Sequence, residues 1–170
     1  MTKQIDPNLI FEAKNIILTG SNYIDTGFQA FSSENINRDF KITIRASELT
    51  YTVSTCVIIG CKYEGSVNGV SYPGFYYRFN GSNSASVQVS TAGNRSTNYN
   101  LSTVLNKNMY IWRTNTTTLH SMLEDGTDQT LTINSTTFDR NLLIGAGMQG
   151  NGTLFRYVKG TIDYIKIEYI

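Results

Sequence analysis

Three observations predict an all-β fold, a two-sheet antiparallel β-sandwich, for this sequence. First, apolar and polar residues alternate along most segments that carry hydrophobic side chains, and helical periodicity is nearly absent. Second, clusters of Gly, Asn, Asp and Ser interrupt these segments about every ten residues, a spacing typical of sandwiches and barrels. Third, only 16% of the residues are charged, and the polar residues are mainly Asn, Ser and Thr, which favour turns and half-buried strands over helices.

The alternating segments define the predicted strands and their faces. In chain order, the strands span residues 9–18, 23–27, 40–49, 54–63, 74–80, 85–90, 109–115, 117–124, 129–133, 142–145 and 160–169. In FKITIRASEL, Phe40 and Ile42 fall on one side of the strand, which we expect in the core. In the last strand, the side of Ile165 and Ile167 is the more apolar, so we expect it to be buried and Ile162 to face outward.

A hairpin is predicted by the segment TLHSMLEDGTDQTLTI. Alternation turns Leu119 and Ser121 inward and His120 and Met122 outward. The strand ends on Asp125-Gly126, a favoured hairpin turn, which leads into the return strand.

Charge and hydropathy argue against two classes of partner. The formal net charge is +1 and the basic residues are scattered singly, so no basic stripe is present to neutralise a run of phosphates. No apolar stretch approaches the ~20 residues that cross a bilayer, and the N-terminus has no signal-peptide h-region. We therefore expect no nucleic-acid partner and no membrane insertion, and a soluble product made in the cytoplasm.

Three stretches at the beginning, middle and end of the chain carry a family resemblance. They are NIILTGSNYIDTGFQAFSSENINRDFKITIRA, TLHSMLEDGTDQTLTI and NLLIGAGMQGNGTLFRYVKGTIDYIKIEY. In this order they resemble the concanavalin A-like (laminin G-like) jelly rolls of bacteriophage tail and baseplate structural proteins and of Gram-positive cell-surface proteins. The resemblance implies two stacked antiparallel sheets, one of them curved into a concave surface, with loops at the rims.

The organisation of the chain favours one unit. No internal repeat, Pro-rich linker or charge block divides it. We therefore expect residues 1–170 to form a single lectin-like β-sandwich domain. Its short leader and its end within a strand pattern suggest a fragment of a larger structural protein.

Catalytic patterns are missing from the sequence. Some family relatives are glucanases with a Glu-x-Asp-x-x-Glu strand motif, and nothing in this chain matches it. The chain has one histidine, His120, which could act as a base, but no Ser lies in the G-x-S-x-G motif of a serine nucleophile. Cys56 and Cys61 lie on opposite faces of one predicted strand, so we expect no disulfide between them. We therefore predict that the chain is not an enzyme, with a cryptic glycosidase as the remaining catalytic alternative.

Calcium is the one metal that remains open. Two Cys and one His leave no recognisable transition-metal spacing, and no cofactor is expected. Laminin G-like relatives sometimes bind Ca²⁺ at a rim, and the resemblance makes Asp25, Asp125, Asp128 and Asp139 candidate ligands. The alternative, which we favour, is that these isolated carboxylates form turns.

The segment YPGFYYRFNGSNSASVQVSTAGNRSTNYN combines aromatic, Arg and amide side chains. Sugar sites pair aromatic rings with such hydrogen-bonding groups. Alternation places Phe75, Tyr77 and Phe79 on one face and Tyr76 with Arg78 on the other. Because Arg is rarely buried unpaired, we expect Tyr76 and Arg78 to face solvent or a groove.

Further candidates for saccharide contact lie on other predicted strands and loops. They are Tyr72, Gln88, Arg95, Asn98, Tyr99, Arg113 and His120. Of these, Gln88, Arg113 and His120 fall on strand positions that we expect to face outward. The single tryptophan, Trp112, is expected in the core or in the layer next to it, and is a secondary candidate only.

These patterns favour a non-catalytic carbohydrate-binding module. The resemblance implies a phage tail or baseplate component, assembled in the host cytoplasm, that adheres to a saccharide of the bacterial cell surface beside other virion proteins. The alternative is a structural or protein-interaction domain of the virion without sugar binding. A second possible location is the bacterial cell surface, as part of a larger protein.

Overall fold

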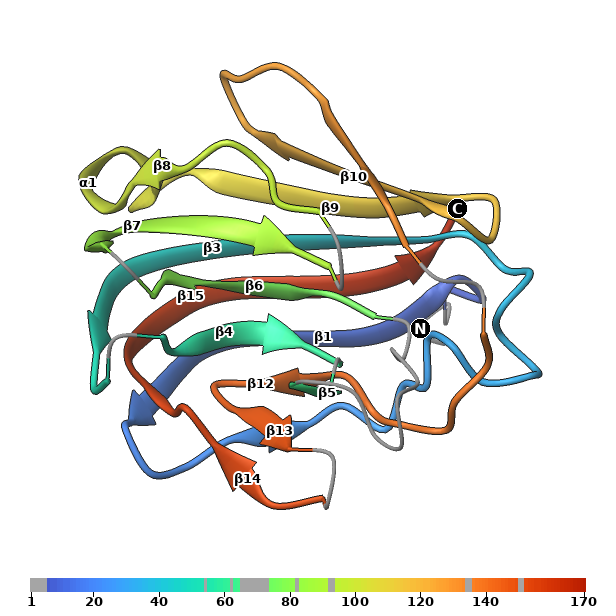
Figure 1. The fold of residues 1–170 in the computed structure, drawn as a ribbon, viewed down its shortest axis with the longest axis horizontal. Helices are drawn as coiled ribbons and strands as arrows, with labels where there is room; N and C mark the ends of the chain where they lie inside the picture. Colours follow the sequence, from blue (N-terminus) through green and yellow to red (C-terminus); the bar gives the residue numbers. More distant parts are fainter. Residues whose placement is uncertain are drawn as a thin grey trace, which may run out of the picture.

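The computed structural model confirms the predicted all-β sandwich (Figure 1). It describes residues 6–53, 55–61, 63–64, 74–81, 83–91, 94–133, 136–149 and 152–170. Two six-stranded antiparallel sheets pack face to face around one hydrophobic core, and a small third sheet lies beside the second. In the described part of the chain, no helix is long and apolar enough to cross a membrane.

The strands are ordered as follows in each sheet. Sheet A runs β1 (Leu9–Thr19), β15 (Val158–Tyr169), β3 (Phe40–Tyr51), β9 (Asn108–Thr114), β10 (Thr118–Leu123) and β11 (Gln129–Thr132). Sheet B runs β2 (Ile24–Asp25), β12 (Leu143–Ile144), β4 (Val57–Gly60), β6 (Tyr76–Asn80), β7 (Asn83–Ser90) and β8 (Tyr99–Asn100). Sheet C contains β14 (Leu154–Phe155), β13 (Gly147–Gln149) and β5 (Tyr63–Glu64), and a short helix, α1 (Leu101–Val104), follows β8.

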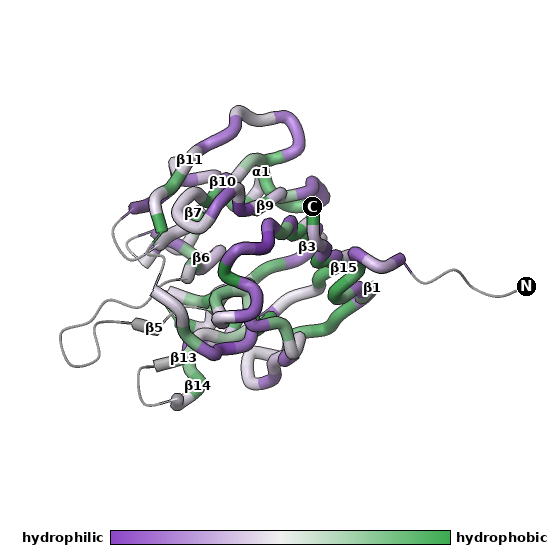
Figure 2. Tube along the Cα trace, turned by 90° about the vertical axis from the view of Figure 1, so that its right-hand side faces the viewer, coloured by the Kyte–Doolittle hydropathy of each residue, from purple (hydrophilic) through white to green (hydrophobic). Residues whose placement is uncertain are grey.

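The core lies between sheets A and B and uses the faces predicted from alternation. Phe40 and Ile42 of β3 are fully buried, as are Phe75 and Phe79 on and beside β6. The rings of Phe40 and Phe75 stack with centroids 6.3 Å apart and so join the two sheets. Figure 2 shows hydrophobic segments where β1, β3 and β15 lie. Burial of each such side chain stabilises the fold by about 1.5–3 kcal/mol.

A bulge in β15 changes one predicted face. Ile165 and Ile167 are buried as expected, but Ile162 is also fully buried. The pairing of β15 with β3 shifts register on both sides of Ile162, so the strict alternation breaks there. The prediction that Ile162 faces outward is therefore wrong. Nearby, a Cβ on Gly160 would lie 2.1 Å from the carbonyl oxygen of Glu48, so the two strands approach too closely for any other residue.

The predicted hairpin is present as β10 and β11, with Leu119 opposite Leu131 and Ser121 opposite Gln129. Leu119 and Ser121 are buried, which confirms the predicted inward face. The connection is longer than a two-residue turn. The N–H of Gly126 donates to the carbonyl of Leu123 over 2.7 Å and closes a turn inside a wider loop.

Candidate functional site

The outer face of sheet B, which points away from the core, brings together three of the predicted side chains. On β6, Tyr76 and Arg78 alternate with buried core residues and therefore point to the opposite face. Across the β6–β7 ladder, Tyr76 is paired with Ser90 and Arg78 with Gln88. Directly opposed residues of an antiparallel pair share a face, so these four side chains form one block. We call it the β6–β7 block.

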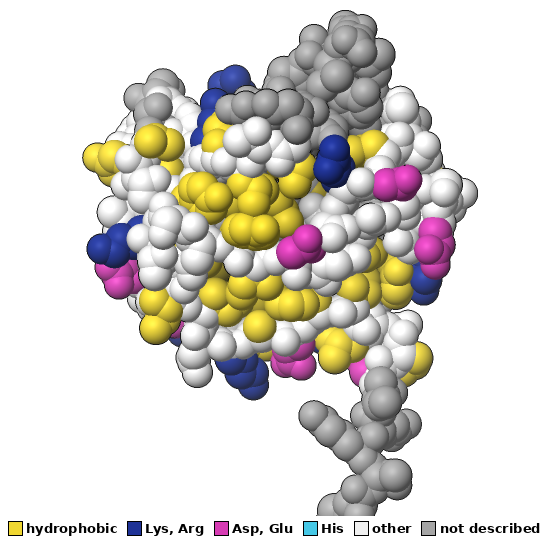
Figure 3. Space-filling view, turned by 90° about the horizontal axis from the view of Figure 1, so that it is seen from below, with side chains coloured by type: hydrophobic (Ala, Val, Ile, Leu, Met, Phe, Trp, Pro, Cys, Tyr) yellow, Lys and Arg dark blue, Asp and Glu magenta, His cyan; other side chains and the backbone are white. Residues whose placement is uncertain are grey.

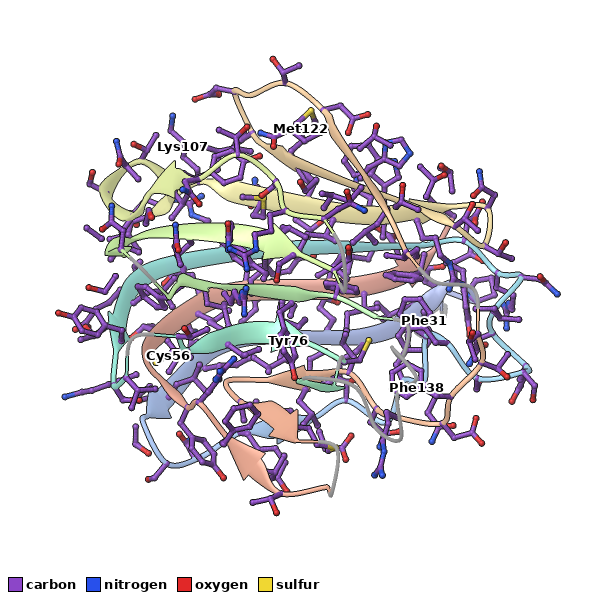
Figure 4. All side chains as sticks on the ribbon, viewed as in Figure 1. Phe31, Cys56, Tyr76, Lys107, Met122 and Phe138 are labelled. Atoms are coloured by element: carbon purple, nitrogen blue, oxygen red, sulfur yellow. The ribbon has the colours of Figure 1, made fainter. Side chains whose placement is uncertain are left out.

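Tyr76 is a buried member of this block, contrary to the expectation that it faces solvent. Its side chain is only 1% exposed. Its hydroxyl donates to the carbonyl of Met148 and accepts from the N–H of the same residue, both over 3.2 Å. Tyr76, which is labelled in Figure 4, thus anchors β13 of sheet C to sheet B. A stacking surface for a sugar is therefore not its role in this structure.

Two polar side chains of the block are buried and incompletely bonded. Gln88 is 3% and Ser90 1% exposed. Within the described residues, neither Gln88 Nε2 nor Ser90 Oγ has a hydrogen-bond partner. Leaving a buried polar group unsatisfied costs about 1–3 kcal/mol, so a water molecule or a ligand that bonded these two atoms would be stabilised there. Arg78, paired with Gln88, is partly exposed beside them.

Two further arginines lie on either side of the β6–β7 block. Arg156 adopts a positive φ of 57°, and its carbonyl accepts the N–H of Val57 over 2.9 Å. Val57 is itself the strand partner of Arg78, so the backbone of Arg156 lies beside the start of β4. The Arg156 guanidinium lies 4.7 Å from the centroid of the Phe155 ring. On the other side, exposed Arg95 forms a bridge with Ser90.

The polar side chains near this face are directional hydrogen-bonding groups. Strands β4, β6 and β7, with residues 94–95 and 154–156, contribute Arg, Gln, Ser, Asn and Tyr side chains and no Asp, Glu, His or Cys. Guanidinium and amide groups donate hydrogen bonds in fixed directions.

Two of the other residues predicted in loops lie at β8, the edge strand of sheet B. Asn98 is exposed in the loop before β8. Tyr99 is half-buried, and its hydroxyl accepts a 2.9 Å hydrogen bond from Gln129 Nε2 of β11. Burial raises the pKa of Tyr99. Tyr72 lies outside the described residues.

Arg113, predicted to face outward as a sugar contact, is fully buried in the core. Its guanidinium donates to the carbonyls of Ala30 over 2.8 Å and Asn35 over 2.7 Å, and also to that of Arg38. Burial lowers the pKa of the guanidinium, an effect that the charge of Asp39 opposes. The prediction failed because both faces of MYIWRTN are equally apolar and the carbonyl partners are distant in sequence.

His120 faces outward as predicted, but on sheet A, the other sheet from the β6–β7 block. Its imidazole stacks on Trp112, with centroids 4.8 Å apart and planes 9° apart. Nε2 lies 2.8 Å from Thr114 Oγ1, and Nδ1 lies 2.8 Å from Asp128 Oδ2. Trp112 is partly exposed on the outer face, so of its two expected places it does not take the one in the core. The predicted saccharide contacts thus divide between the two faces of the sandwich.

The candidate calcium ligands act in turns and ion pairs. Asp25 accepts hydrogen bonds from the N–H of Gly27 and from Asn141 Nδ2. Asp125 pairs with Lys107 at 2.5 Å, and Asp128 holds His120. The fourth candidate, Asp139, is exposed. Among the described residues, no group of three or more His, Cys, Asp or Glu is placed to hold a metal ion.

Comparisons with known proteins identify the fold. Neither a family model nor a curated protein matches the sequence. The K499G mutant of NanB sialidase from Streptococcus pneumoniae is similar in structure, with a TM-score of 0.63 at 14% identity, over 94% of this chain. The chain spans only 26% of that sialidase.

A second neighbour matches along nearly its whole length. The CBM40 of Ruminococcus gnavus IT-sialidase has a TM-score of 0.61 at 10% identity, over 94% of this chain and 91% of that one. The same module bound to α2,3 sialyllactose has a TM-score of 0.57 at 12% identity. The chain therefore has the lectin-like β-sandwich fold of these CBM40 modules.

Proposed function

We propose that this chain is a non-catalytic saccharide-binding module whose site is the outer face of sheet B around Arg78 and Gln88. One observation carries the proposal. Gln88 Nε2 and Ser90 Oγ are buried without a described partner, beside a partly exposed arginine. A sugar with an acidic group and ring hydroxyls would supply acceptors for all three side chains.

The arginines favour an acidic saccharide over a neutral one. Arg78 lies between Arg156 on the β4 side and Arg95 beyond Ser90. A guanidinium binds a carboxylate through two parallel N–H···O bonds, which gives both affinity and orientation. The CBM40 neighbour was solved with a sialylated sugar, α2,3 sialyllactose, which carries such a carboxylate. A sialylated oligosaccharide is therefore the first ligand to test.

The virion setting is a separate proposal, based on the sequence resemblance. In it the ligand is a saccharide of the bacterial cell surface, and other virion proteins are the partners. Many copies on one particle would turn weak single-site binding into adhesion, because the second contact is intramolecular once the first is made.

An interaction domain without sugar binding is the second candidate, favoured by exposed apolar side chains. Figure 3 shows hydrophobic side chains gathered in bands on the face seen from below. Ile17 of the edge strand β1 is 70% exposed, and Tyr23 and Val53 are also exposed. Large exposed apolar patches mark protein interfaces. For this role we expect the purified chain to associate as its concentration rises. We expect Ile17→Lys to abolish that association.

Isothermal titration with 3′-sialyllactose, with lactose as the neutral control, tests the proposed site. We expect saturable binding of the acidic sugar only, and a loss of at least about tenfold in affinity in Arg78→Ala, since a hydrogen bond to a charged group contributes about 1.5–3 kcal/mol. Arg45→Ala is the matched control, because Arg45 is an exposed arginine on sheet A. Equal affinity in the Arg78 and Arg45 variants would refute the site.

A further inference from the structure

The outer face of sheet A carries a groove that the proposed site on sheet B does not use. The groove encloses about 600 Å³ and is lined by Lys41, Tyr110, Trp112, Met122, Glu124 and Ile170. Its volume falls in the range of small-ligand sites, about 300–1,000 Å³. Met122, labelled on β10 in Figure 4, lies in a different part of the molecule from Tyr76.

Strand register explains how these side chains meet. On β9, Tyr110 and Trp112 are two positions apart and share the outer face. Tyr110 is paired with Met122 of β10, and Trp112 is paired with Lys41 of β3. Two rings, a thioether and a lysine therefore converge above three adjacent strands. Ile170 follows the end of β15 and contributes an apolar side chain.

Trp112 is held in a fixed orientation before any ligand arrives. One face of its indole stacks on His120. The imidazole is itself fixed at both nitrogens, by Thr114 and by Asp128. Only the indole face opposite His120 is left for the groove. A preorganised ring loses little conformational freedom on binding, which favours stacking of a flat ligand surface.

The charges of the groove offset each other. Lys41 Nζ lies 4.8 Å from the centroid of the Tyr110 ring, so it borders the aromatic surface. Glu124 lines the groove as well, and its Oε2 accepts the N–H of Asn108 over 2.9 Å. One cation and one anion give no net preference for a charged ligand, in contrast to the arginines of sheet B. They do supply a donor and an acceptor for hydroxyl groups.

We propose that this groove is a second binding site, which takes a neutral hexopyranose stacked on Trp112 and Tyr110. The apolar C–H face of the sugar packs on the two rings and on Met122, and its hydroxyls bond Lys41 and Glu124. The inference is independent of the acidic-sugar site, because no residue is shared between the two.

The protein offers a direct reporter for this site, since Trp112 is its sole tryptophan. We would titrate the full chain with cellobiose, maltose and N,N′-diacetylchitobiose and follow tryptophan emission. At least one of these neutral disaccharides is expected to change the emission saturably. Arg78→Ala should leave that titration unchanged, which separates this site from the one on sheet B.

Variants of the groove complete the test. Tyr110→Ala is expected to weaken the neutral sugar at least about tenfold by calorimetry, comparable to other single stacked aromatic contacts. Tyr164→Ala, on the same face but outside the groove residues, is the control and should bind normally. Three results would each overturn the inference: no emission change with any neutral disaccharide, equal binding in both tyrosine variants, or self-association of the chain that Tyr110→Ala abolishes.

Discussion

At the residue scale, Arg113 shows how a charged side chain can organise the core. It stands on the inward face of β9 beside Met109 and Ile111. Its guanidinium ties the segment between β2 and β3 to the core through the carbonyls of Ala30, Asn35 and Arg38, and it lies 4.9 Å from the Phe40 ring centroid. The side chain thus adds to the local backbone bonds of this irregular segment, such as that from the N–H of Arg38 to the carbonyl of Asn35.

Arg113→Met is expected to lower the free energy of unfolding by about 3–5 kcal/mol, because it removes the donor to the buried carbonyls of Ala30 and Arg38 and one of the two donors to that of Asn35. Urea denaturation followed by circular dichroism measures this change. Arg45→Met, on an exposed position of the neighbouring strand, should change stability by less than about 0.5 kcal/mol. A similar small effect at both positions would show that Arg113 contributes little to the fold.

Cys61 is a second residue whose burial has a measurable consequence. Cys56 and Cys61 are both buried and free. Burial raises the pKa of the Cys61 thiol to about 12, against an ordinary value near 9. The unfolded chain therefore releases this proton at a pH where the folded chain keeps it. The resulting stability is fully present below about pH 9 and is lost as pH rises toward 12.

We accordingly expect the free energy of unfolding to fall between about pH 8 and about pH 10, with a slope of up to about 1.4 kcal/mol per pH unit. Urea titrations of wild type and Cys61→Ala at these two pH values measure it. The variant should show the weaker pH dependence. Identical slopes in the two proteins would contradict the assigned burial of this thiol.

Residue faces were predictable where one side of a strand was clearly more apolar. Phe75 and Phe79 on one face and Arg78 on the other follow from alternation alone. The fate of Tyr76 does not, because its hydrogen-bond partner Met148 lies 72 residues away in the chain. Arg113 escaped prediction for the same reason, since its carbonyl partners lie 75 to 83 residues away.

At the element scale, the long strands were predictable and the short ones were not. β1, β3 and β15 each contain eleven or twelve residues, which is enough to show their alternation. β8 and β14 contain two residues each and carry no pattern of their own. Their pairing depends on neighbours that the fold brings near. Arg156 directly follows β14, and for this reason it was not among the predicted site residues.

The contact of β15 with β3 gives a test at this scale. Gly160→Ala is expected to destabilise the protein by about 2 kcal/mol or more, because the new methyl group would meet the backbone of Glu48 at 2.1 Å. Gly152→Ala is the control for backbone strain, because Gly152 also has a positive φ. Nothing lies within 4 Å of the position of a Cβ on Gly152, so this variant has the strain without the collision. Thermal unfolding of both variants should show the larger loss at Gly160, and equal losses would rule out the collision.

At the scale of the whole molecule, the sandwich separates two polar surfaces. The core between sheets A and B is mainly apolar, with Arg113 as its charged member. The outer faces carry different chemistry: arginine, amide and hydroxyl groups on sheet B, and aromatic rings with balanced charges on sheet A. The sequence indicated both sets of residues but not their division, since only strand order assigns β6 and β7 to one sheet and β9 and β10 to the other.

The most direct test of saccharide binding is a map of backbone amide chemical shifts during titration with 3′-sialyllactose. Saturable shifts are expected along β6 and β7, largest at Gln88 and Ser90, with β9 and β10 of sheet A unchanged. Shifts confined to sheet A, or no saturable shift at Gln88 and Ser90, would contradict an acidic-saccharide site on sheet B.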